Sequence, residues 1–184
     1  TLAFVNDVAS SIEGHPDNAS ASVYGSVTVS WADVLEGPDA PRDWHTAVLR
    51  PHPDVVPVVI VPAQRLSTAT ARAALPESVP LAVAARNSGR AALLAHAITT
   101  EPSLLMPATL DALHQEQRRS AYPDSMALVD ALRDAGVPAV ISGAGPTVLA
   151  LASRFALRAV HDVARGGEVL ELSVPTRGIT PMSR

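Results

Sequence analysis

The stretch AVISGAGPTVLALA, residues 139–152, decides the fold of this chain. Its two apolar runs, Ala139–Ile141 and Thr147–Ala152, lie on either side of a glycine-rich segment. Such short apolar runs beside a turn signal are typical of buried strands, so the pattern predicts two strands joined by a turn. Gly143 and Gly145 would supply the positive φ angles that a tight turn needs. Alternatively, the same glycines could turn backbone N–H groups towards an anion.

Strands and helices alternate on both sides of this turn. Upstream, Val58–Val61 is a β-branched run that predicts a buried strand, and downstream Val169–Val174 alternates as a closing strand. Helical spacing and capping residues predict helices at residues 68–75, 81–98, 104–113, 125–135 and 156–165. The order strand, helices, strand, strand, helix, strand is the split β-α-β pattern of ferredoxin-like folds, which places the chain in the α+β class.

The first 54 residues are expected to form a separate domain. Their periodicity predicts two helices and two strands, at residues 1–13, 17–24, 27–31 and 47–49. Asp17 or Asn18 would cap the second helix. Prolines at positions 51, 53 and 57 mark a boundary, which gives domains of residues 1–54 and 55–184.

Composition excludes several classes of protein. Hydrophobic residues make up 47% and charged residues 17% of the 184 residues, which favours a folded core over disorder. All 14 basic residues are Arg and there is no Cys, so a Walker-A lysine and cysteine-held metals are excluded. A net charge of −4 and 3% aromatic residues disfavour a nucleic-acid surface.

The chain carries no pattern typical of a membrane span or of export. The longest uncharged run, residues 137–153, is interrupted by proline and glycine, and no basic stretch precedes an apolar run at the N-terminus. We therefore expect a cytoplasmic protein that binds neither membranes nor nucleic acid. Because the chain starts at Thr1 rather than Met, we also expect it to be part of a longer protein.

The segment EGHPDN concentrates four polar side chains at a turn before a predicted helix: Glu13, His15, Asp17 and Asn18. The free N–H groups of a helix N-terminus attract a phosphate or a carboxylate, so the segment is a candidate ligand site. A polar turn of the Asx type is the plainer interpretation, and the sequence leaves both open.

Two arginines stand out from the rest. Arg72 follows Thr68 by four residues in STATAR, so both can share one helix face, and Arg118 ends the polar segment LHQEQR. The planar guanidinium suits bidentate binding of a carboxylate or phosphate. Most arginines are instead solvated surface groups, which is the interpretation for Arg119, Arg154, Arg158 and Arg165.

Taken in order, EGHPDN, STATAR, LHQEQR and ISGAGPT resemble the motifs of homoserine kinases in the GHMP kinase superfamily, from about Asp7 to Ile179. The resemblance implies the end of the N-terminal kinase domain followed by a ferredoxin-like C-terminal domain. It implies ATP-dependent phosphorylation of the L-homoserine hydroxyl to O-phospho-L-homoserine, a step of threonine biosynthesis, with Mg²⁺ neutralising phosphate oxygens. A mevalonate-type kinase is a weaker alternative, because EGHPDN argues against it.

The resemblance also assigns roles to residues. Asn18 would contact the substrate hydroxyl and align transfer, with His15 and Asp17 in the same pocket. Arg72, beside Thr68, would act with Asn18 in catalysis and, together with Arg118, clamp the substrate carboxylate. The loop near the active site would consist of Gly143, Ala144 and Gly145.

Two features depart from the family pattern. The family's phosphate loop, of the form PxxxGLGSSAA, is absent from these residues. The position of the expected Mg²⁺ ligand, a glutamate, is Ser11, so Glu13 or Asp7 substitutes, the alignment shifts locally, or metal binding is impaired. These departures favour an alternative: a non-catalytic, ferredoxin-like module of a degenerate kinase that binds a small ligand or pairs as a homodimer.

Overall fold

The computed structural model describes residues 1–33, 43–62, 74–165 and 167–180. It divides into two compact units: unit 1 comprises Thr1–Pro51 with Val174–Arg184, and unit 2 comprises His52–Ser173. The bounds differ from the predicted ranges 1–54 and 55–184, because the C-terminal residues group with unit 1. The assignment of these ranges to two kinase domains stays a prediction.

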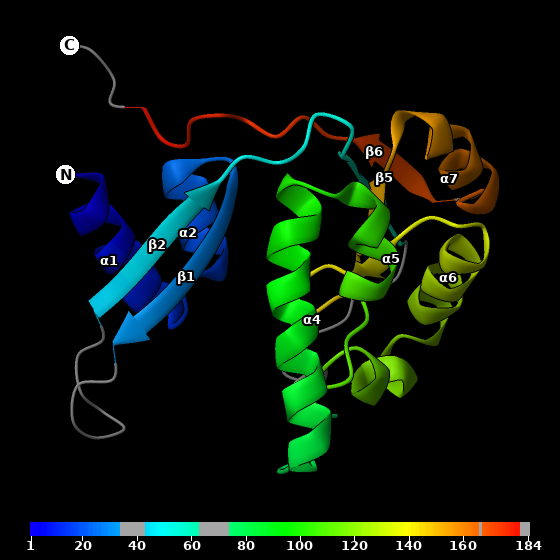
Figure 1. Cartoon of the computed structure of the whole chain (residues 1–184), viewed down its shortest axis with the longest axis horizontal. Coiled ribbons are helices and arrows are strands. Elements are labelled where there is room, and N and C mark those ends of the chain that lie inside the picture. Colours follow the sequence, from blue (N-terminus) through cyan, green and yellow to red (C-terminus); the bar gives the residue numbers. More distant parts are fainter. Residues whose placement is uncertain (34–42, 63–73, 166, 181–184) are drawn as a thin grey trace. The chain divides into compact units, whose positions relative to one another are not determined.

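Unit 2 is built on an antiparallel sheet with the order β4-β5-β3-β6. Figure 1 labels two of its strands, β5 and β6. The strands are β3 (Val56–Val61), β4 (Ala139–Ile141), β5 (Val148–Ala152) and β6 (Glu168–Glu171). Because β5 lies antiparallel between β3 and β4, the split β-α-β pattern and the α+β class are confirmed. The closing strand is shorter than predicted: Leu172 still donates its N–H to the Pro57 carbonyl at 2.9 Å, and the following residues leave the sheet.

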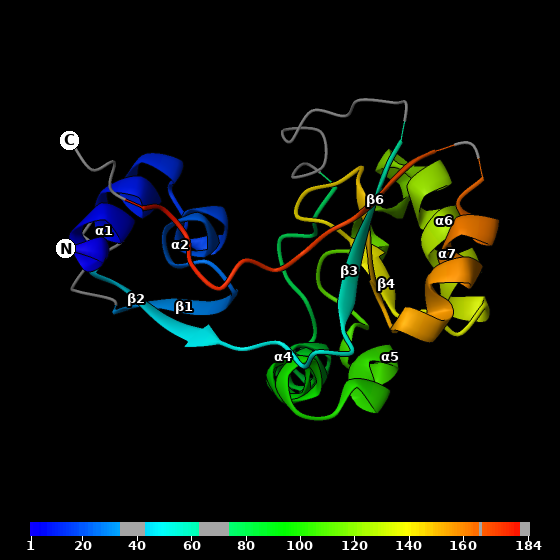
Figure 2. The ribbon, with the colours of Figure 1, turned by 90° about the horizontal axis from the view of Figure 1, so that it is seen from above.

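Helices cover both faces of this sheet (Figure 2). They are α4 (Leu81–Thr99), α5 (Leu105–Ala108), α6 (Pro123–Asp134) and α7 (Leu157–Val163). Successive side chains of a strand point to opposite faces. Val148 and Ala150 of β5 therefore pack in the cluster with α6 and α7, whereas Leu149 and Leu151 pack with α4 and α5. The sheet is thus buried on both sides.

The predicted helix 104–113 is wrong over its second half, because α5 ends at Ala108. The next carbonyl that a continuing helix would need is taken by another donor. The Arg133 guanidinium donates to the Met106 carbonyl at 2.6 Å, and the N–H of Leu110 donates at 3.4 Å to the Pro107 carbonyl instead. Most of the predicted helix 68–75 lies outside the described residues, and its last two residues are not helical.

Unit 1 contains two helices, α1 (Leu2–Glu13) and α2 (Asp17–Tyr24), and the antiparallel hairpin of β1 (Val27–Asp33) and β2 (Asp43–Leu49). The predicted cap of the second helix is wrong: Pro16 is the N-cap, Asp17 is already helical, and no side chain caps the helix. Residues 174–180 belong here because Ser26 donates its N–H to the Pro175 carbonyl at 2.7 Å and Ile179 donates to the Ser22 carbonyl at 3.1 Å.

Polar groups fill the inside of unit 1. Asn6, Ser10 and Ser20 are fully buried. The Ser20 hydroxyl donates to Asn6 Oδ1 at 2.8 Å and accepts a hydrogen bond from the Thr46 hydroxyl at 3.0 Å. Apolar side chains of α1 lie outside instead, with Ile12 83% exposed. Hydrogen bonds therefore join the helices of this unit to its hairpin.

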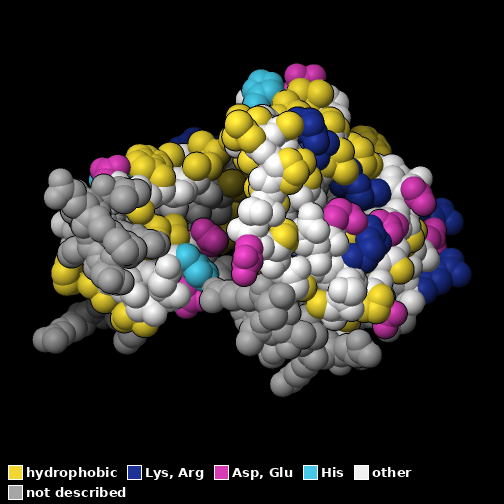
Figure 3. Space-filling view, turned by 90° about the horizontal axis from the view of Figure 1, so that it is seen from below, with side chains coloured by type: hydrophobic (Ala, Val, Ile, Leu, Met, Phe, Trp, Pro, Cys, Tyr) yellow, Lys and Arg dark blue, Asp and Glu magenta, His cyan; other side chains and the backbone are white. Residues whose placement is uncertain are grey.

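Basic and acidic side chains are interspersed on the face of unit 2 that Figure 3 shows. Arg119 is an example: it contacts Glu116 at 2.9 Å and Asp130 at 2.7 Å. The described helices include none with the length and apolar character needed to cross a bilayer.

Candidate functional site

A cavity of about 390 Å³ opens within unit 2, between α4, residues 108–122 and the strands β4 and β5. Its apolar wall includes Ala91, Leu94, Ile98, Val140, Leu149 and Leu151. Its polar residues include Asn87, Arg90, Asp111, His114, Gln115 and Arg118. Concave sites with an apolar wall and a few polar groups are typical of small-ligand pockets.

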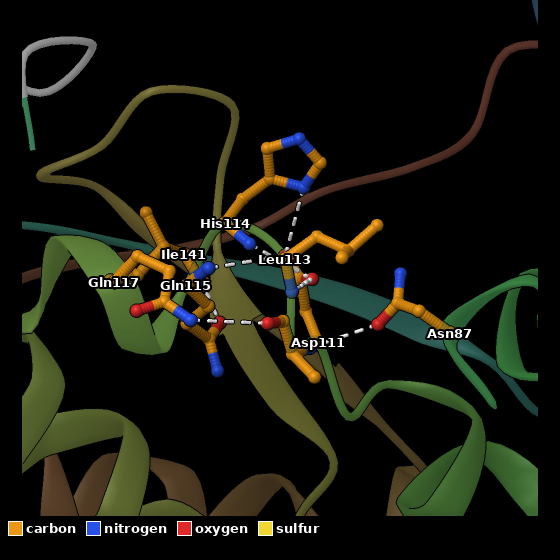
Figure 4. Close-up of polar contacts among 8 residues, drawn as sticks. Asn87, Asp111, Leu113, His114, Gln115, Gln117 and Ile141 are labelled. Atoms are coloured by element: carbon orange, nitrogen blue, oxygen red, sulfur yellow. Dashed lines mark hydrogen bonds and ion pairs between the residues drawn. The ribbon is translucent and has the colours of Figure 1, made fainter. Parts of the chain in front are cut away.

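Residues of the segment from Asp111 to Arg118 form one wall of this cavity. Figure 4 shows the polar contacts around Asp111. The Asp111 carboxylate accepts the N–H groups of Leu113 at 2.8 Å, His114 at 3.1 Å and Gln115 at 3.2 Å. This is how an N-cap satisfies the first N–H groups of a helical turn. Positions 111, 114, 115 and 118 all line the cavity, and a 3-10 helix begins at Glu116.

Arg118 is a buried cation in this wall, with 9% of its surface exposed. Its backbone N–H donates to the carbonyls of His114 and Gln115, each at 3.2 Å, so the backbone beneath the side chain is held. The neighbouring hydroxyl of Tyr122 is buried, and burial raises its pKa, while the positive charge of Arg118 acts in the opposite direction. A buried guanidinium beside an apolar wall is suited to a small carboxylate.

The glycine-rich segment forms the tight turn that the sequence predicts. Ser142 donates its N–H to the Thr147 carbonyl at 2.8 Å, and Gly145 donates to the Ser142 carbonyl at 2.9 Å. Gly143 and Gly145 both have positive φ, 58° and 79°. Within the described part of the chain, the N–H groups of Gly143 and Ala144 have no hydrogen-bond acceptor. The segment can therefore form a tight turn and still present backbone N–H groups to an anion.

Two contacts link this loop to the segment that carries Arg118. The N–H of Ile141, the residue before the loop, donates to Gln115 Oε1 at 2.8 Å. The Tyr122 side chain packs against Ile141 and Ala144. The structure thus brings Arg118 and Gly143, two of the predicted site residues, to the same cavity.

The EGHPDN residues gather at the turn between α1 and α2 in unit 1. The His15 ring is half-buried, with its Nε2 at 4.0 Å from Glu13 Oε1 and its Nδ1 at 4.0 Å from Asp17 Oδ2. The side chain of Asn18 is exposed. That these groups meet Arg118 in one pocket stays a prediction. Thr68 and Arg72 lie outside the described residues.

The described side chains do not fit a metal ion held by the protein. In the ranges that the structure covers, no group of three or more His, Cys, Asp or Glu side chains could hold one. Ser11, at the expected ligand position, is exposed and has no carboxylate. Glu13 and Asp17 have the His15 ring between them instead. No protein ligand to Mg²⁺ is therefore assigned.

Sequence reasoning missed several residues of the cavity, above all Asp111 and Tyr122. Asp111 had a readable signal, because it precedes His114 by three residues and Arg118 by seven, the spacing of one helix face. Tyr122 had none: only the tertiary structure places its ring beneath the glycine loop.

The chain is similar to known proteins in both sequence and structure. Residues 82–166 match the family model described as GHMP kinases C terminal. The chain is 50% identical over 112 residues to the homoserine kinase of Streptomyces avermitilis, covering 61% of this chain and 34% of that protein. It is 50% identical over 115 residues to the homoserine kinase of Rhodococcus opacus, covering 60% of this chain and 37% of that protein. The match thus spans about a third of the length of these relatives.

Solved structures show the same fold. A putative homoserine kinase from Listeria monocytogenes aligns with a TM-score of 0.68 and 26% identity, covering 97% of this chain and 60% of that one. The homoserine kinase of Cytophaga hutchinsonii aligns with a TM-score of 0.75 and 24% identity, covering 89% of this chain and 53% of that one. Residues 82–166 therefore match the C-terminal domain of the GHMP kinases, and the chain is similar in sequence to homoserine kinases over more than half of its length.

Proposed function

We propose that this chain belongs to a homoserine kinase, which transfers the γ-phosphoryl group of ATP to the side-chain hydroxyl of L-homoserine. The observation that carries the proposal is the shared cavity of unit 2, where the buried Arg118 and the glycine loop meet. About 50% identity to homoserine kinases over 112 residues supports the same conclusion. The product would be O-phospho-L-homoserine, on the route to threonine.

The substrate's carboxylate would bind Arg118. The guanidinium is buried in the wall of a cavity whose other wall is apolar, so little water competes for it. Arg72 would be the second clamp, beside Thr68. The carbon chain of an amino acid would lie along apolar side chains such as Leu94 and Leu149.

Phosphoryl transfer asks a protein for positioning and for stabilisation of charge. The N–H groups of Gly143 and Ala144, which have no acceptor among the described residues, are suited to a phosphate oxygen. Asn18 would align the hydroxyl, with His15 and Asp17 beside it. Mg²⁺ would enter as part of the MgATP substrate, since the described residues offer no site for it.

Calorimetric titration of the chain with L-homoserine tests the proposal. We expect saturable binding, a loss of about tenfold or more in affinity in Arg118→Ala, and no change in Arg154→Ala, a matched surface substitution. Equal affinities in all three proteins would contradict the assignment of Arg118. Titration with MgATP, followed by an assay for O-phospho-L-homoserine, tests transfer itself.

A second candidate is a non-catalytic module that binds a small ligand or pairs as a homodimer. One observation favours it: Ser11 stands at the expected Mg²⁺ ligand, and the described part of the chain has no cluster of metal-ligating side chains. Homoserine binding without MgATP binding or transfer would select this alternative. The cytoplasmic location and the homodimer stay predictions.

A further inference from the structure

We propose that Asp111 is a positioning residue: its carboxylate holds the turn that carries Arg118 and so sets where the guanidinium meets the carboxylate of an amino-acid ligand. The inference rests on the proposed function, and it adds a residue that neither the motifs nor the comparisons single out. Asp111 lies seven residues before Arg118, and both residues line the cavity.

The Asp111 carboxylate accepts several backbone N–H groups of the turn that follows it. Its Oδ1 accepts the N–H groups of Leu113 at 2.8 Å and His114 at 3.1 Å, and its Oδ2 accepts that of Gln115 at 3.2 Å. The preceding N–H, of Ala112, donates to Asn87 Oδ1 of α4 at 2.9 Å (Figure 4). Four consecutive N–H groups are thus fixed by side chains.

This turn is joined to Arg118 by backbone hydrogen bonds. The N–H of Arg118 donates to the carbonyls of His114 and Gln115, which are two of the residues that Asp111 holds. Gln115 is in turn fixed to β4 through its 2.8 Å hydrogen bond from Ile141. Without the carboxylate, three N–H groups would lose their acceptor. The turn would then no longer hold the backbone of Arg118 in place. A displacement of about 1 Å at a binding group can cost about a hundredfold in function.

The contacts of the Asp111 carboxylate distinguish a positioning role from direct contact with the ligand. A free Asp111 carboxylate could instead bind the ligand's ammonium group. Its oxygens already accept three N–H groups, and Oδ2 also lies 3.4 Å from His114 Nδ1, so most of their accepting capacity is used. The structure therefore favours an effect of Asp111 on the ligand that acts through Arg118.

The test compares three variants of the whole chain by calorimetric titration. Asp111→Ala removes the acceptor, and Asp111→Asn keeps one carbonyl oxygen for Leu113 and His114. Glu116→Ala removes an exposed acid of the same segment and serves as the control. We expect L-homoserine to bind about tenfold or more weakly in Asp111→Ala, within about threefold of normal in Asp111→Asn, and normally in the control.

Two analogues decide which ligand group is affected. 4-Hydroxybutanoate keeps the carboxylate but lacks the ammonium group, and 2-amino-1,4-butanediol keeps the ammonium but lacks the carboxylate. Positioning through Arg118 predicts that Asp111→Ala weakens binding of the first and leaves the second unchanged. The opposite result would show direct contact with the ammonium and overturn the proposal.

A nuclear magnetic resonance readout keeps the inference separate from the proposed function. The Nε–H signal of Arg118, assigned by its loss in Arg118→Lys, is expected to be sharp in the unmodified chain and broadened or moved to the position of a free side chain in Asp111→Ala. An unchanged signal would overturn the positioning role. If the unmodified chain binds no homoserine, the proposed function fails for this chain, and the spectra alone decide the role of Asp111.

Discussion

Gln115 accepts at its Oε1 a 2.8 Å hydrogen bond from the backbone N–H of Ile141, the last residue of β4. The glutamine is 7% exposed, so water hardly competes for the bond. Through it, the segment that carries Arg118 is fixed to the strand that leads into the glycine loop. This contact joins two parts of the cavity that lie 26 residues apart in the sequence.

Replacing Gln115 by alanine should destabilise unit 2. The Ile141 N–H would lose its acceptor in a largely dry place, which costs about 1 to 3 kcal/mol of unfolding free energy. Urea denaturation followed by circular dichroism measures the loss. Gln117→Ala, at an exposed neighbouring position, is the matched control and should change stability by less than about 0.5 kcal/mol. Equal stabilities of the two variants would contradict a structural role for the bond.

Gly145→Ala should be more destabilising than Gly143→Ala, although both glycines have positive φ. Left-handed backbone alone costs an alanine about 1 to 2 kcal/mol. At position 145 the new methyl group would also lie 2.9 Å from Ile141 Cγ2 and 3.0 Å from Tyr122 Cε1, whereas nothing lies within 4 Å at position 143. The difference between the two unfolding free energies isolates the steric contribution, about 1 kcal/mol or more. No difference would show that the Tyr122 ring moves freely.

Arg133→Ala should be among the more damaging substitutions of a charged residue. Its guanidinium donates to the Thr109 hydroxyl at 2.9 Å and to the carbonyls of Met106 at 2.6 Å and Ala139 at 3.2 Å. Burial lowers the pKa of Arg133, yet an arginine keeps its charge at neutral pH.

The loss should be about 2 to 3 kcal/mol, because the hydroxyl of the buried Thr109 and two carbonyls would lose this donor. Arg158→Ala is the control, since its side chain is 94% exposed. Thermal and urea denaturation of both variants check the prediction, and a comparable small effect in each would refute it.

The pair of Asp130 with Arg119 should make stability depend on pH in the acidic range. The hydrogen bond from Arg119 holds the pKa of the Asp130 carboxyl below its ordinary value. Because the folded-state pKa is lowered, the stabilisation is fully present above the unfolded pKa, about 3.9, and is lost as pH falls through the folded pKa.

Asp130→Asn should therefore reduce stability by about 0.5 kcal/mol at pH 7, since the pair is half-exposed. The difference between the two proteins should shrink once the pH falls below about 4 and also in about 1 M salt. Urea denaturation at several pH values measures it. A constant difference from pH 7 to the acid limit of folding would contradict the ion pair as its source.

Much of the fold follows from local chemistry in the sequence. The strands β4 and β5 and the turn between them were predictable, because two short apolar runs on either side of a glycine-rich segment are typical of two strands joined by a tight turn. Helix α4 was predictable from periodicity over its 19 residues. The helix predicted at residues 104–113 failed in its second half because Arg133, from a distant part of the chain, donates to the Met106 carbonyl that the next turn would need.

The sequence by itself determined the strand order along the chain, the glycine turn and the candidate role of Arg118, because each depends on residue types within a short window. Only the tertiary structure decided that Arg118, Gly143 and Asp111 share one cavity, since hydrogen bonds and packing join segments far apart in the sequence. It also decided that Asp111 caps the turn before Arg118. An aspartate can cap a helical turn, pair with a cation or face the solvent, and the N–H groups that surround it in the folded chain decide which of these roles it takes.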